Sequence, residues 1–130
     1  MAVNVKLLRA VKRLIQEEPR RLDMHVWGRK VTQDRKSAPP CGTTACLAGW
    51  IVLAATPPYE WEDVVGDSES KMYNFASRKG GSNVANLASQ LVGIPEGQMP
   101  FMQMTWNADR VIQWIDSKIA EVEAQGTVNW

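Results

Sequence analysis

The stretch Pro39-Pro40-Cys41-Gly42-Thr43-Thr44-Ala45-Cys46-Leu47-Ala48-Gly49-Trp50 decides the fold of this chain. Two prolines and a glycine indicate a loop. From Ala45 to Ala55 the chain then runs without a charged or amide side chain. We predict a helix from Thr44 to about Ala55, with Thr43 as its N-cap. A helix that is apolar on every side is buried on every side, so we expect the rest of the fold to wrap around it.

Further helices are predicted around this one, because apolar residues recur at helical spacing between start and stop signals. They cover Val5–Glu18 after the cap Asn4, Asn83–Val92 after the cap Ser82, and the residues from the cap Asn107 to about Ala124. One short helical turn is expected in Pro95–Met104. Residues 57–81 are predicted only coarsely, as a minor β or irregular element or as a short helix or hairpin near 69–77. The expected fold is mainly α: a single domain over residues 1–130, a small bundle of about four helices around a buried central helix.

The composition fits a soluble globular domain, with 45% hydrophobic and 22% charged residues in 130. The longest apolar run, about Ala45–Ala55, is too short to cross a bilayer, and the N-terminal residues lack the apolar core of a signal peptide. We therefore expect a cytoplasmic protein with no membrane partner. In that compartment its two cysteines are thiols, although a local Cys41–Cys46 disulfide is an alternative.

Charge is unevenly distributed along the chain. Residues 1–36 hold ten Lys/Arg against four Asp/Glu, a balance of +6, and the remainder holds five against ten, a balance of −5. One interpretation is an internal dipole, with the basic segment packed near the acidic C-terminal helix. The other is an acidic partner or a nucleic acid bound through the basic first third. The basic face of the first helix has no interleaved aromatics and no helix-turn-helix signature, so the internal dipole is favoured.

Cys41 and Cys46 are the candidates for chemistry. A thiol near a helix N-terminus has a lowered pKa, because the unpaired N–H groups and the helix dipole stabilise the thiolate. In this hypothesis Cys41 is the nucleophile and His25, the single histidine, is the base. The N–H groups of the Thr44–Cys46 turn would hold an oxyanion. In the structural alternative, Cys46 fills the core and Cys41 closes a turn.

The same end of the helix is the predicted ligand site, formed by Thr43, Thr44, Cys46, Trp27 and Trp50. Trp50 and Trp114 are expected in the core, whereas Trp61 and Trp130 could line a cleft or a partner surface. No metal is predicted, because one Cys-x4-Cys and one histidine do not have the spacing of a zinc site. No cofactor is predicted either, because Lys79-Gly80-Gly81 lacks the spacing of a phosphate-binding loop.

Two resemblances bear on the central stretch. Residues 41–50 resemble a C-G-T-x-x-C-x-A-G-W signature shared by small proteins of bacteria and their phages, together with Asp23, Met24, Trp27 and Gly28 upstream and Leu91–Ile94 downstream. This resemblance implies no function. Cys41-Gly42 and Ala45-Cys46-Leu47 are also similar to the catalytic loop of cysteine peptidases that trim bacteriocin leaders, which implies a nucleophilic Cys41. Those peptidases take their histidine from downstream, and here none follows Cys41.

The function predicted from the sequence is therefore a non-catalytic binding or interaction module, associated with a phage or mobile element. A cysteine-dependent hydrolase or transferase using Cys41 is the alternative from a different class. A binder of an acidic partner or nucleic acid is the third hypothesis.

Overall fold

The computed structural model describes residues 3–17, 19, 22–24, 29–30, 43–66, 70–101, 103, 105–125 and 128–129. The α-helices in these residues are α1 (Val5–Glu17), α2 (Leu47–Ala54), α3 (Ser70–Arg78), α4 (Val84–Val92) and α5 (Ala108–Gln125). Two 3-10 helices, η2 (Pro58–Asp63) and η3 (Glu96–Gln98), and four two-residue strands join them. The mainly α prediction is confirmed. In the part of the chain described, no helix is long and apolar enough to cross a membrane.

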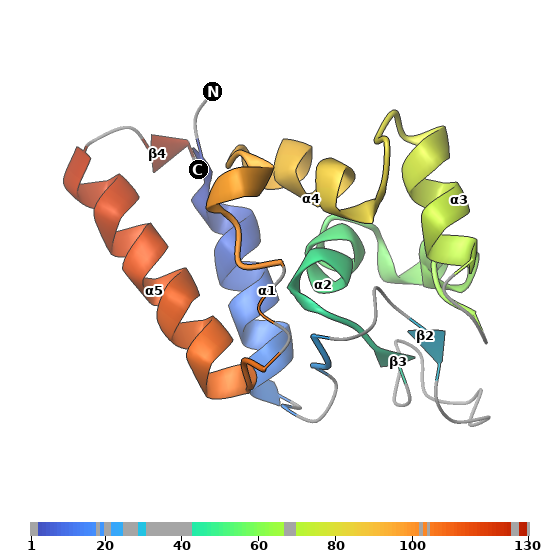
Figure 1. The fold of residues 1–130 in the computed structure, drawn as a ribbon, viewed down its shortest axis with the longest axis horizontal. Coiled ribbons are helices and arrows are strands. Elements are labelled where there is room, and N and C mark those ends of the chain that lie inside the picture. The colour runs from blue at the N-terminus through green and yellow to red at the C-terminus, as the bar shows by residue number, and fades with distance from the viewer. Residues whose placement is uncertain are drawn as a thin grey trace.

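Helix α2 is the centre of the fold, as its composition predicts. Seven of its eight residues, Leu47–Leu53, are buried. It packs on α1 and α4, and Figure 1 shows it almost end-on, beside α1 and below α4. The apolar faces of the neighbours complete the same core, because Val11 and Ile15 of α1 and Val84 and Ala88 of α4 are also buried.

The predicted start of this helix is wrong by three residues. Thr43 and Thr44 form the strand β3, which pairs antiparallel with β2 (Arg29–Lys30). Ala45 then makes a parallel bridge to Leu22, and its carbonyl accepts from the N–H of Asp23 at 2.9 Å. The N-cap is Cys46, whose backbone is extended and whose side chain makes no capping hydrogen bond. Strand pairing competes for the backbone groups that a helix beginning at Thr44 would need.

Helices α1 and α5 lie side by side and run in opposite directions (Figure 1). The predicted cap of α1 is confirmed, since the N–H of Leu7 donates to Oδ1 of Asn4 at 3.0 Å. The cap of α5 is confirmed as well, because the N–H of Arg110 donates to Oδ1 of Asn107 at 2.9 Å. The stripe predicted for α5 is buried, and it consists of Val111, Ile115, Ile119 and Val122.

In the described part of 57–81, the regular elements are helices. The minor β element allowed there does not form in these residues, which instead build η2 and α3. Pro57 and Pro58 have no N–H to give to a strand ladder, and Pro58 begins η2. In α3, the spacing of Met72 and Ala76 buries one face while the remainder stays largely exposed. The short β pairings lie elsewhere: β1 (Val3–Asn4) pairs in parallel with β4 (Val128–Asn129).

Helix α4 follows a tight connection from α3. Gly80 has a φ of 89°, which glycine adopts without strain. Gly81 is buried, and a Cβ added there would lie 2.8 Å from Cβ of Leu87. The N-cap of α4 is Asn83, one residue after the predicted Ser82, because its Oδ1 accepts from the N–H of Asn86 at 2.8 Å. Gly93 ends the helix in the left-handed conformation, as predicted.

Candidate functional site

The site predicted from the sequence is only partly described by the structure. Among its residues, His25, Trp27 and Cys41 lie outside the described ranges, and so does Trp130. Thr43 and Thr44 belong to β3, so an extended Ala45–Cys46 segment separates them from α2. The backbone N–H groups of Thr44–Cys46 therefore do not form the open first turn of a helix that the oxyanion hypothesis requires.

Cys46 and Trp50 are part of the core. Cys46 is 2% exposed and Trp50 is 1% exposed. The indole of Trp50 meets that of Trp61 edge to face, with ring centroids 6.2 Å apart, an arrangement that aromatic pairs favour. A ligand in solution reaches neither side chain unless the core opens.

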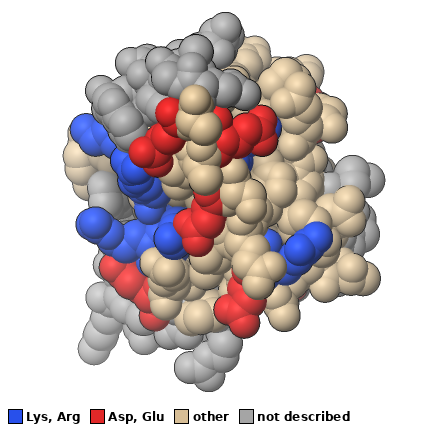
Figure 2. Space-filling model, turned by 90° about the vertical axis from the view of Figure 1, so that its left-hand side faces the viewer, with Lys and Arg blue, Asp and Glu red and all other residues tan. Residues whose placement is uncertain are grey.

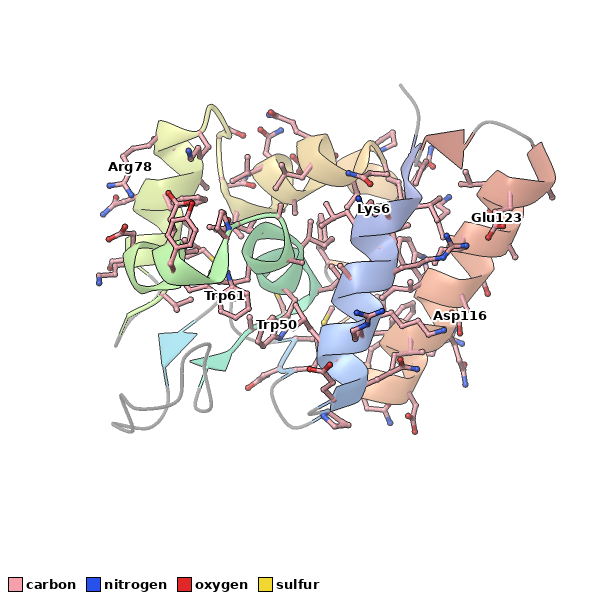
Figure 3. The ribbon with its side chains drawn as sticks, turned by 180° about the vertical axis from the view of Figure 1, so that it is seen from behind. Lys6, Trp50, Trp61, Arg78, Asp116 and Glu123 are labelled. Carbon is pink, nitrogen blue, oxygen red and sulfur yellow. The ribbon has the colours of Figure 1, made fainter. Side chains whose placement is uncertain are left out.

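The possibility that Trp61 lines a cleft is wrong. Trp61 is 5% exposed, and its Nε1 donates to the carbonyl of Thr56 at 2.8 Å. Thr56 in turn donates its hydroxyl to the carbonyl of Val52 at 2.7 Å. These bonds hold η2 under the end of α2, where Figure 3 shows Trp61 and Trp50 next to each other. Trp114 is half-buried and packs against the core, whereas Trp50 is fully enclosed, as predicted for both.

The basic face of α1 is engaged with α5. Arg9 Nη2 lies 3.0 Å from Oε1 of Glu123, and Lys12 Nζ lies 2.6 Å from Oδ1 of Asp116. Figure 2, which views the molecule from the α5 side, shows basic and acidic residues interleaved over this face. The predicted internal dipole is confirmed for these residues. An open hollow of about 420 Å³ on α1 is lined by Lys6, Arg9, Ala10 and Arg13, but part of its charge is already compensated by Glu123.

A larger concave surface lies on the opposite side of the molecule, between η2, α3 and α4. Two hollows, of about 570 and 420 Å³, share Glu60, Phe75 and Lys79 as lining residues. Because the same three residues line both hollows, the hollows are neighbours, and together we call them the η2–α3–α4 groove. Each volume falls within the range of about 300–1,000 Å³ that is typical of ligand sites.

The two halves of this groove differ in chemistry. In the polar half, Glu60 and Asp63 of η2 stand across from Arg78 and Lys79 at the end of α3. The apolar half, so named for Pro57, Leu87 and Leu91, is also lined by Thr56, Glu60, Lys79 and Gln90. Charged side chains are therefore more numerous in the polar half, while both halves expose polar and apolar surface.

Phe75 and Lys79 join the two halves. Lys79 Nζ lies 5.5 Å from the centroid of the Phe75 ring, so the ring face attracts and positions the ammonium group. Within the described residues, no ion pair joins Arg78 or Lys79 to Glu60 or Asp63. Figure 3 shows Arg78 projecting outward from α3.

The described residues contain no group of three or more His, Cys, Asp and Glu side chains placed to hold a metal. Comparisons with models of protein families, with curated proteins and with solved structures found no match for this chain.

The groove was not predicted from the sequence, although a signal for it exists. Lys71, Phe75 and Lys79 recur every four residues, and Asn74 and Arg78 lie beside them on the same helical face. That pattern has meaning only once residues 70–78 are known to be helical. Its apolar half depends on the position of α4, which the sequence does not reveal.

Proposed function

We propose that this chain is a cytoplasmic, non-catalytic binding module and that the η2–α3–α4 groove is its binding face for a segment of another protein. The two neighbouring hollows of this groove are the observation that carries this proposal, because together they combine charged groups with apolar surface. Interfaces use the same combination, with apolar contacts for affinity and charged groups for orientation.

A peptide titration followed by NMR tests the binding face. The probes are three blocked hexapeptides that contain two leucines and differ at one position, which is glutamate, glutamine or lysine. With at least one of them at millimolar concentration, we expect amide shifts to cluster in Asn74–Lys79 and Leu87–Leu91. Shifts that stay absent up to about 10 mM of all three peptides, or that cluster elsewhere, contradict the proposal.

Thiol chemistry tests the non-catalytic part. Cys46 is buried, so rapid alkylation of the native protein reports on Cys41. We expect alkylation by iodoacetamide across pH to follow a normal thiol pKa near about 8.5. The variant Cys46→Ala is the matched control and should show the same profile. A pKa well below that value, lost in Cys41→Ser, would favour the hydrolase or transferase alternative instead.

A further inference from the structure

We draw no further inference here: the strongest candidate, the basic hollow on α1 lined by Lys6, Arg9, Ala10 and Arg13, carries none, because Glu123 already pairs with Arg9 and nothing in the part of the chain that the structure describes shows what covers the hollow.

Discussion

Helices α2 and α3 are of similar length but differ in what they contribute. Seven of the eight residues of α2 are buried, whereas α3 buries Met72 and Ala76 of its nine. Helix α2 forms the centre of the core and exposes almost no surface to a partner. Helix α3 contacts the core through one narrow face, and its charged side chains line the groove. The core and the candidate binding surface thus belong to different helices, although the sequence motif of residues 41–50 runs into α2.

Removing a large side chain from α2 is expected to have the largest effect. Trp50→Ala leaves a cavity at the centre of the core and takes the partner ring from Trp61, so it should lower the free energy of unfolding by about 3–5 kcal/mol. Urea unfolding followed by circular dichroism measures this loss. Tyr73→Ala, which removes an exposed aromatic from α3, is the control and should change stability by less than about 0.5 kcal/mol. Similar losses in both variants would contradict the contrast between the two helices.

The connection between α3 and α4 is expected to be the next most sensitive position. Gly81→Ala places a Cβ 2.8 Å from Cβ of Leu87 and 3.1 Å from the Asn83 carbonyl oxygen, so the connection must shift. We expect a loss of about 1–3 kcal/mol in unfolding free energy. At Gly97 a Cβ has nothing within 4 Å, so Gly97→Ala is the matched control. Wild-type stability in Gly81→Ala would contradict this expectation, because it would show that the connection between α3 and α4 can shift to accept a Cβ without loss.

The cap of α4 distinguishes the sequence prediction from the structure. Asn83→Ala removes the acceptor for the Asn86 N–H and should cost about 1 kcal/mol. Ser82→Ala should be near neutral, because the exposed Ser82 contributes its backbone N–H, which donates to Oδ1 of Asn86 at 3.0 Å. Thermal unfolding of the two variants gives the comparison. A larger loss of stability in Ser82→Ala than in Asn83→Ala would support Ser82, the N-cap predicted from the sequence.

The ion pairs between α1 and α5 are expected to contribute least. The side chains of Lys12 and Asp116 are 29% and 51% exposed, so a double-mutant cycle of Lys12→Ala and Asp116→Ala should give a coupling of about 0.2–1 kcal/mol. The coupling should fall with added salt. The same cycle applied to Arg78 and Asp63 should give none. A coupling between those two groove residues would mean that their charges already interact with each other.

Much of the fold was predictable because local signals coincide with the packing. The buried centre of α2, the caps Asn4 and Asn107 and the stop at Gly93 all follow from residues within a few positions. Helix α3 was predicted only as an alternative, since its buried stripe consists of only Met72 and Ala76. The start of α2 was mispredicted because Thr43 and Thr44 pair with residues far away in the sequence.

The candidate site was less predictable than the fold. Trp61 stands in an acidic surface segment, and nothing local indicates that its indole reaches under α2 to the Thr56 carbonyl. The groove joins residues of three elements, and Glu60, Phe75 and Leu91 carry no motif that marks them as neighbours.

The sequence by itself determined that this chain is mainly helical around one apolar helix, because hydrophobic periodicity and capping act over a few residues. The tertiary structure decided which charges are paired and which face is left open. Arg9 and Lys12 meet Glu123 and Asp116 only because α5 returns beside α1. Arg78 and Lys79 line a groove only because η2 and α4 both pack against α3. Such contacts join residues distant in the chain, and they form only when burial of the shared core places the helices.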